Sequence, residues 1–160
     1  MTALMTIFAY LLGSLSSAVI VSKKLAMPDP RGYGSGNPGA TNVLRSGRKD
    51  AAALTLLGDA LKGLVAVVIA RCLAGWLMLP DSIVACAAVA VVIGHMFPIF
   101  FGFKGGKGVA TAFGVLLGMS FWATFWVVLV WAFIAFKFKK SSLAALVAAV
   151  VTPIVAFIVI

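Results

Sequence analysis

Residues 82–103 read SIVACAAVAVVIGHMFPIFFGF, a run of 22 residues without a single Asp, Glu, Lys or Arg. A helix needs roughly 20 predominantly apolar residues to cross the hydrocarbon core of a bilayer. The run is followed at residues 104–108 by KGGKG, which places two cations and three glycines at its end. This stretch predicts a membrane-spanning helix that ends in a basic, glycine-rich loop.

The composition of the whole chain agrees with a membrane protein. Hydrophobic residues make up 63% of the 160 residues and charged residues 11%, whereas soluble domains carry roughly 25% charged residues. The formal net charge is +9, which in a soluble protein would indicate nucleic-acid binding. Here the cations lie in short clusters between apolar runs, as in the cytoplasmic loops of membrane proteins. We therefore expect membrane lipids around the chain and no nucleic-acid partner.

The apolar segments predict an all-α fold, a polytopic transmembrane helical bundle in a single integral membrane domain, 1–160. The uncharged stretch 109–136 is divided in two because Lys107 precedes it and Lys137 follows it, so that both of its ends are expected in the cytoplasm. Six helices are expected, with spans at about 3–22, 51–70, 82–103, 109–118 (short), 120–136 and 141–160.

The two ends of the chain and its charge bias predict its orientation. Residues 3–22 are interpreted as a retained span, because no Lys or Arg precedes them and no small-residue cleavage site follows. The run 141–160 has no basic anchor after it, and we expect the chain to be truncated at its C-terminus. Eleven of the 13 basic residues fall in three loops, 23–50, 103–108 and 137–140. This bias predicts that the three loops are cytoplasmic and the N-terminus outside.

The first basic loop contains GSGNPGATNVLR at residues 34–45. It combines glycines, which allow backbone amides to turn towards an anion, with neutral donors and a guanidinium suited to phosphate. The candidate phosphate-binding residues are Gly34, Ser35, Gly36, Asn37, Thr41, Asn42 and Arg45. The pattern G-x-G-x-x-G is also present, but a dinucleotide fold is excluded because no strand precedes it between membrane spans. The alternative is that the glycines only make a flexible loop.

The second basic loop, GFKGGKG at residues 102–108, has a similar composition with more charge. Lys104 and Lys107 offer point charges to phosphate oxygens, and Gly105 and Gly106 allow close backbone approach. The loop is not a Walker A motif, because Gly108 stands where a Ser or Thr would hold magnesium. The alternative is a plain positive-inside anchor.

Three ionisable residues lie inside predicted spans. His95, the only histidine, is either a base for a hydroxyl or a hydrogen-bonded residue that orients the adjacent loop. Asp59 and Lys62 share a helix face, and their mutual neutralisation is the simpler interpretation, although Lys62 could lend its charge to a phosphate site. The acids are scattered, so that no metal site is expected.

At these loops the sequence resembles the acyl-phosphate:glycerol-3-phosphate acyltransferase family, known as PlsY. The resemblance covers nearly the whole chain, and the two long loop motifs are its specific part. It is carried by Gly13 to Ser17, by 34–45, by Asp59-x-x-Lys62-Gly63, by Gly94-His95-x-Phe97-Pro98 through Thr111, and more weakly by Ser142-Leu143. A further family motif of the His-x-x-Asn type, near the C-terminus, has no counterpart here.

The resemblance implies a seven-helix enzyme of the bacterial inner membrane. Such an enzyme transfers a fatty acyl group from acyl phosphate to the 1-hydroxyl of glycerol 3-phosphate, giving lysophosphatidic acid and phosphate in the first acylation of phospholipid synthesis. It uses no cofactor, metal, acyl-CoA or carrier protein, and it works with a partner enzyme that makes the acyl phosphate. The rival functions are a transporter of a phosphorylated solute and a purely structural membrane subunit.

The resemblance also implies roles for individual residues. Ser35, Asn37 and Thr41, with the amides around Gly36, would hold one phosphate. Arg45, Lys104 and Ser142 would hold glycerol 3-phosphate, although the position of Ser142 in sequence alone favours a helix N-cap. The catalytic candidates are Ser35, Lys104 and His95. The departing phosphate is one candidate for the proton acceptor, and His95 is the other.

Overall fold

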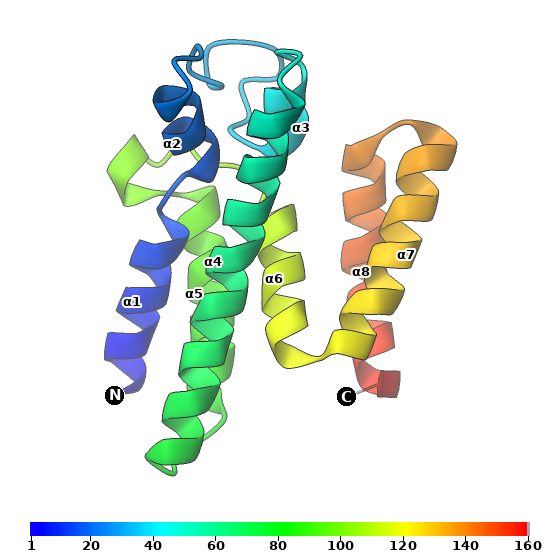
Figure 1. Ribbon diagram of the computed structural model, residues 1–160. Helices are drawn as coiled ribbons and strands as arrows, with labels where there is room; N and C mark the ends of the chain where they lie inside the picture. Colours follow the sequence, from blue (N-terminus) through cyan, green and yellow to red (C-terminus); the bar gives the residue numbers. More distant parts are fainter. Residues whose placement is uncertain (160) are drawn as a thin grey trace. The chain divides into compact units, whose positions relative to one another are not determined.

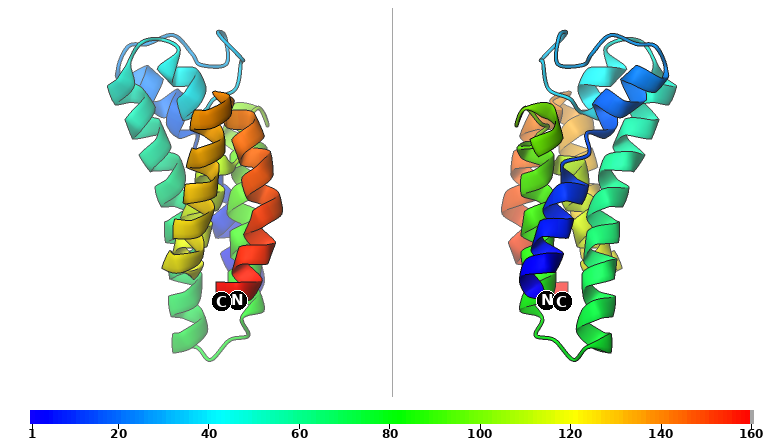
Figure 2. Two further views of the ribbon diagram at one scale, coloured as in Figure 1. Left: turned by 90° about the vertical axis from the view of Figure 1, so that its right-hand side faces the viewer. Right: turned by 90° about the vertical axis from the view of Figure 1, so that its left-hand side faces the viewer.

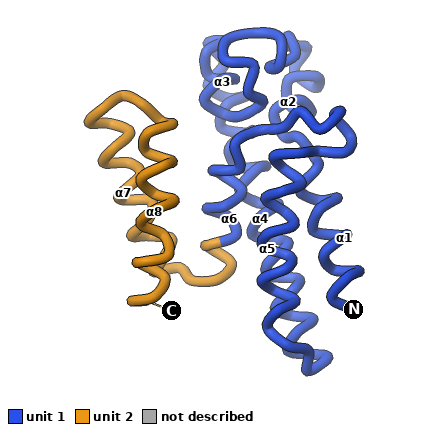
Figure 3. Tube along the Cα trace, turned by 180° about the vertical axis from the view of Figure 1, so that it is seen from behind, with its two compact units in different colours: residues 1–115 blue, residues 116–160 orange. Residues whose placement is uncertain are grey.

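The computed structural model describes residues 1–159 (Figure 1). These residues form helices and connecting loops and contain no strand, which confirms the expected all-α class. Four helices are long and apolar enough to cross a bilayer, and a bent pair of helices makes a fifth candidate span. The chain folds as two compact units, residues 1–115 and 116–160 (Figure 3).

The first unit contains most of the helices and both glycine-rich loops. Its elements are α1 (Thr2–Gly13), α2 (Ser17–Lys24), α3 (Ala40–Leu44), α4 (Lys49–Trp76), α5 (Ser82–Met96), a 3-10 helix η1 (Ile99–Phe101) and most of α6 (Val109–Met119). The second unit holds α7 (Phe121–Phe138) and α8 (Ser141–Val159). The break between α6 and α7 falls at Ser120, close to the turn expected at 118–120.

The first apolar segment, expected as one helix over residues 3–22, is broken. The axes of α1 and α2 differ by 42°, and Ser14 to Ser16 form the break. A broken helix leaves carbonyl groups without helical partners, and in a membrane these must be satisfied by protein. The ammonium of Lys62 on α4 does this, because its Nζ donates to the carbonyl oxygen of Leu15 at 2.8 Å.

Glycines bring the helices of the first unit into backbone contact. A Cβ atom on Gly13 of α1 would overlap the carbonyl oxygen of Val91 on α5, and one on Gly94 of α5 would overlap that of Tyr10. In the same way, a Cβ on Gly63 of α4 would overlap the carbonyl oxygen of Thr111 on α6. Small residues at such crossings are how membrane helices pack closely. These contacts fix the helix ends that carry the loops.

One helix is longer than the sequence predicts, and one predicted span contains an interruption. The span expected at 51–70 is part of a helix of 28 residues, Lys49–Trp76, because a charge such as Arg71 does not stop a helix. At 1.5 Å per residue this helix is about 42 Å long and exceeds the roughly 30 Å hydrocarbon core. The span expected at 82–103 lies over Ser82–Phe101. Within it α5 ends at Met96, because Pro98 disfavours helical geometry at Phe97.

The second unit is a helical hairpin of α7 and α8 (Figure 3). The hydroxyl of Ser120 accepts a hydrogen bond from the Ala123 amide at 3.3 Å and so caps α7. The α7 helix exposes Trp122 and Trp126, whose rings meet Phe125 edge to face. Exposed aromatic side chains of this kind are typical of a helix that faces lipid and its interface with water.

Candidate functional site

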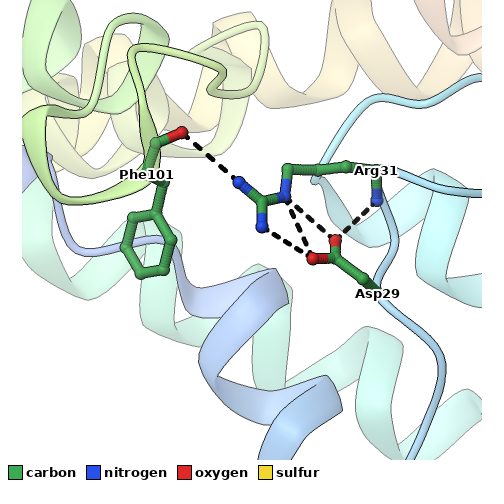
Figure 4. A network of polar contacts seen from close by, with 3 residues as sticks. All are labelled: Asp29, Arg31 and Phe101. Carbon is green, nitrogen blue, oxygen red and sulfur yellow. Dashed lines mark hydrogen bonds and ion pairs between the residues drawn. The ribbon is translucent and has the colours of Figure 1, made fainter.

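Both glycine-rich loops lie at the same end of the first unit. The first loop follows α2 and leads into α3 and α4, and the second follows α5 and η1 and leads into α6 (Figures 1 and 2). The two loop regions are also in direct contact, because Nη1 of Arg31 donates to the carbonyl oxygen of Phe101 at 3.3 Å (Figure 4). A site built from both loops needs this arrangement.

The contact between the loop regions depends on an Asp–Arg pair that sequence reasoning missed. Asp29 accepts hydrogen bonds from Nε of Arg31 at 3.0 Å and from Nη2 at 2.7 Å, and the guanidinium lies 5.9 Å from the ring centroid of Phe101. The guanidinium lowers the pKa of the Asp29 carboxyl. The sequence shows an acid two residues before an arginine, but nothing in it indicates a partner 70 residues away.

Asn42, predicted to bind substrate, is part of the scaffold of the first loop. Its side-chain oxygen accepts from the amide of Ser35 at 2.9 Å, and its nitrogen donates to the carbonyl oxygens of Pro30 at 2.7 Å and Tyr33 at 3.1 Å. The residue is 1% exposed. A buried amide group whose oxygen and nitrogen are both engaged inside the loop has little to offer a ligand, so we assign Asn42 to shaping the loop.

The glycines of the first loop are likewise required by its turns. Gly34 and Gly36 have φ of +60° and +68°, values that glycine adopts at no steric cost, and a Cβ on Gly34 would overlap the side-chain oxygen of Asn42. The amide of Gly36 donates to the carbonyl oxygen of Tyr33 at 2.9 Å. The turn therefore already uses the Gly36 amide, and a phosphate contact from the amides around Gly36 stays a prediction.

The donors that the first loop leaves accessible are side chains. Ser35, Thr41 and Arg45 are exposed and Asn37 is half-buried. Ser35 and Asn37 lie on the loop, Thr41 lies on α3, and Arg45 directly follows α3. The accessible set thus consists of two hydroxyls, one amide and one guanidinium, all of which can donate to phosphate oxygens.

The second loop rests on the end of α5. The amide of Gly106 donates to the carbonyl oxygen of His95 at 3.1 Å. A Cβ on Gly105 would overlap the same carbonyl oxygen, and a Cβ on Gly106 would overlap Nε2 of the His95 ring. Glycine is required at both positions by this close approach. Lys104 and Lys107 on either side of the glycine pair are exposed.

His95 is buried beneath the second loop. Its ring is 6% exposed, and Nδ1 lies 3.5 Å from Oδ1 of Asp59. Asp59 also pairs with Lys62 at 3.0 Å, as the spacing along the helix predicts. Of the two interpretations left open for His95, its contacts with Gly105 and Gly106 favour support of the loop.

The loop end of the first unit carries excess positive charge. Among residues 1–159, Asp29 pairs with Arg31, Asp50 with Arg48 and Asp59 with Lys62. No carboxylate of residues 1–159 forms an ion pair with Arg45 or Lys104. Uncompensated cations gathered at one surface raise the local concentration of anions there. The geometry and the charge are therefore suited to substrates that carry phosphate.

Ser142 lies in the first turn of α8 in the second unit, and its side chain is exposed. Its role towards a substrate stays a prediction. In the described part of the chain, no three His, Cys, Asp or Glu side chains form a group that could hold a metal ion.

The amino-acid sequence of this chain is similar to proteins of a known family. Residues 3–160 match the family model described as glycerol-3-phosphate acyltransferase. The glycerol-3-phosphate acyltransferase of Neisseria gonorrhoeae (strain NCCP11945) is 65% identical over 148 residues, which are 92% of this chain and 74% of that protein. That of Thiobacillus denitrificans is 60% identical over 153 residues, 96% of this chain and 76% of that protein.

Solved structures give the same relationship. The crystal structure of PlsY (YgiH), an integral membrane glycerol 3-phosphate acyltransferase, in its glycerol 3-phosphate form is 39% identical to this chain with a TM-score of 0.88. The match covers 98% of this chain and 76% of that one. A second structure of that protein, in its lysophosphatidic acid form, matches with a TM-score of 0.86.

Proposed function

Because this chain belongs to the glycerol-3-phosphate acyltransferase family, and is an acyltransferase of the membrane, we propose that its acyl donor is an acyl phosphate and its product lysophosphatidic acid. The observation that carries the proposal is the pair of cation-bearing glycine loops that meet at one end of the first unit through Arg31 and Phe101. The reaction brings together two substrates, each with a phosphate. Two adjacent anion sites are what such a reaction requires.

The chemistry balances without a metal or a covalent enzyme intermediate. The 1-hydroxyl oxygen of glycerol 3-phosphate forms a bond with the acyl carbonyl carbon, and the bond from that carbon to the phosphate oxygen breaks. The hydroxyl proton goes to the departing phosphate. The protein's part is to hold both phosphates so that hydroxyl and carbonyl meet, and to stabilise the charge that develops.

The accessible donors divide between the two phosphates. Ser35, Asn37 and Thr41 on the first loop bind the phosphate of the acyl donor. The cations Arg45 and Lys104 bind the phosphate of glycerol 3-phosphate. Arginine offers a planar fork and lysine a compact charge, and both are suited to phosphate oxygens.

We place this site at the cytoplasmic face of the bacterial inner membrane, with the N-terminus outside. The clusters of Lys and Arg in residues 23–50 and 103–108 support this orientation by the positive-inside bias. The acyl phosphate would then come from a partner enzyme that acylates phosphate, and the acyl tail would stay in the lipid between helices.

The donor is tested with radiolabelled glycerol 3-phosphate and the full-length protein in detergent. Palmitoyl phosphate is expected to give labelled lysophosphatidic acid, and palmitoyl-CoA is expected to give none. Labelled product from palmitoyl-CoA at a comparable rate would overturn the assignment of the donor.

The site is tested by Arg45→Ala and Lys104→Ala, with Lys49→Ala as a matched control, because Lys49 is an exposed cation at the start of α4. A hydrogen bond to a charged group contributes about 1.5–3 kcal/mol. Each site variant should therefore lose roughly 10- to 100-fold in kcat/KM for glycerol 3-phosphate while keeping its thermal midpoint. Parent activity in both, or equal losses in the Lys49 control, would eliminate the proposed site.

A further inference from the structure

Beneath the second glycine loop, α4 and α5 bury three ionisable side chains for which the proposed reaction has no direct use. Asp59 is 2% exposed, Lys62 5% and His95 6%. Taking a charge out of water costs several kcal/mol per ion unless it is well paired, and ionisable residues inside membrane segments mark functional positions. Their contacts with the first span and with the second glycine loop indicate which segments these side chains position.

On one side the network reaches the break in the first span. Nζ of Lys62 lies 2.8 Å from the carbonyl oxygen of Leu15 and 3.0 Å from Oδ1 of Asp59. One ammonium thus joins the gap between α1 and α2 to α4. Its second contact is with the Asp59 carboxylate on the same helix.

On the other side the network reaches the second glycine loop. Oδ1 of Asp59 lies 3.5 Å from Nδ1 of His95 as an ion-pair contact, and Nδ1 has no hydrogen-bond partner among residues 1–159. The other ring nitrogen, Nε2, faces the position where Gly106 would carry a Cβ. A carboxylate at Nδ1 fixes both the tautomer and the plane of a histidine ring. Here the ring that is fixed in this way supports the loop.

We propose that Asp59, held by Lys62, is a positioning residue that orients the His95 ring and through it the backbone of Gly105 and Gly106. The inference rests on the proposed function, in which the neighbouring Lys104 binds a phosphate. If Asp59 and Lys62 only neutralised each other, neither the contact of Asp59 with the His95 ring nor that of Lys62 with the carbonyl oxygen of Leu15 would be needed. The network therefore sets where the second loop places its cation.

Two double variants of the full-length protein separate positioning from neutralisation. Asp59→Asn with Lys62→Met keeps a side-chain oxygen that can accept from Nδ1 of His95. Asp59→Leu with Lys62→Met has a similar volume and no such acceptor. Neither variant leaves an unpaired charge in the membrane, so similar thermal midpoints are expected.

The expected result is a difference in activity between two equally folded proteins. The Asn variant should keep kcat/KM for glycerol 3-phosphate within about threefold of the parent, and the Leu variant should lose roughly 10- to 100-fold, the range found when the supporting partner of a metal-bound histidine is removed. Equal activity in the two variants, whether high or low, would overturn the proposal.

Hydrogen exchange tests the same inference without substrate, so that its outcome is independent of the reaction. The Gly106 amide, which donates to the His95 carbonyl oxygen, should exchange at the parent rate in the Asn variant and faster in the Leu variant. His95→Asn, which keeps a nitrogen near Asp59 but has no ring under Gly106, should also exchange faster. Parent rates in both the Leu and the His95→Asn variants would overturn the positioning role even if the acyltransferase reaction is confirmed.

Discussion

Replacing Gly105 by Ala puts a methyl group where atoms at the end of α5 already lie. The added Cβ would overlap the carbonyl oxygen of His95 and would lie 2.6 Å from both the carbonyl oxygen of Met96 and Cδ of Pro98. Ordinary van der Waals contact begins at 3.4 Å. Because two of these three neighbours are backbone atoms of a packed helix end, the loop must move by roughly 1 Å to bring the distances of 2.6 Å to 3.4 Å.

A displacement of this size has a large kinetic effect. Misplacing a binding group by about 1 Å can cost on the order of 100-fold in rate, and Lys104 is the residue next to the substitution. We expect Gly105→Ala to lower kcat/KM for glycerol 3-phosphate by about that factor in the full-length protein. The thermal midpoint should fall little, because the loop can move away from α5 towards solvent.

Gly75→Ala is the matched control. This glycine lies in α4, has no atom within 4 Å of an added Cβ, and should gain up to about 1 kcal/mol of helix stability with unchanged activity. If Gly105→Ala kept parent activity, the close fit of the second loop onto His95 would not matter for the reaction, and the reasoning would be refuted.

Three other predictions concern packing, pH and the second unit. Gly13→Ala should destabilise the protein by about 1–3 kcal/mol and lower its thermal midpoint, because the Cβ would overlap the carbonyl oxygen of Val91; an unchanged midpoint would contradict the close crossing of α1 and α5. The Asp29 carboxyl, whose pKa Arg31 lowers, should stabilise the protein above about pH 4 and lose that effect as pH falls through its lowered pKa. The thermal midpoint of Asp29→Asn should therefore lie below that of the parent at pH 7 and approach it in acid, and a gap that widens in acid would refute this. Ser142→Ala should raise KM for glycerol 3-phosphate in steady-state kinetics with little change in thermal midpoint, whereas a lowered midpoint with unchanged KM would assign Ser142 to capping alone.

The amino-acid sequence predicts the helical architecture because hydrophobic length and charge clusters depend on local composition. Residues 82–103 and the cations on either side of 109–136 were enough to predict the all-α class and the turn near Ser120. The sequence does not reveal the break at Ser14 to Ser16, because the groups that satisfy it come from α4. It also understates the length of α4, because Arg71 lies within the helix.

The sequence indicates which residue types could form the candidate site, but it does not show the hydrogen bonds among these residues. Loops rich in hydrogen-bond donors can be recognised in the sequence. Which of these donors form hydrogen bonds within the loop depends on its turns. Asn42 and the Gly36 amide are used by carbonyl groups at Pro30 and Tyr33, and nothing in their spacing distinguishes them from Ser35. The partners of His95 lie on other elements of the fold, so its role required three-dimensional contacts.

The proposed reaction holds two substrate phosphates side by side, so that one leaves only when the other substrate accepts the acyl group. Its most direct measurement is the release of phosphate from palmitoyl phosphate by the full-length protein in detergent, with and without glycerol 3-phosphate. We predict release only when glycerol 3-phosphate is present, with one lysophosphatidic acid formed for each phosphate. Release at the same rate without glycerol 3-phosphate would contradict the account.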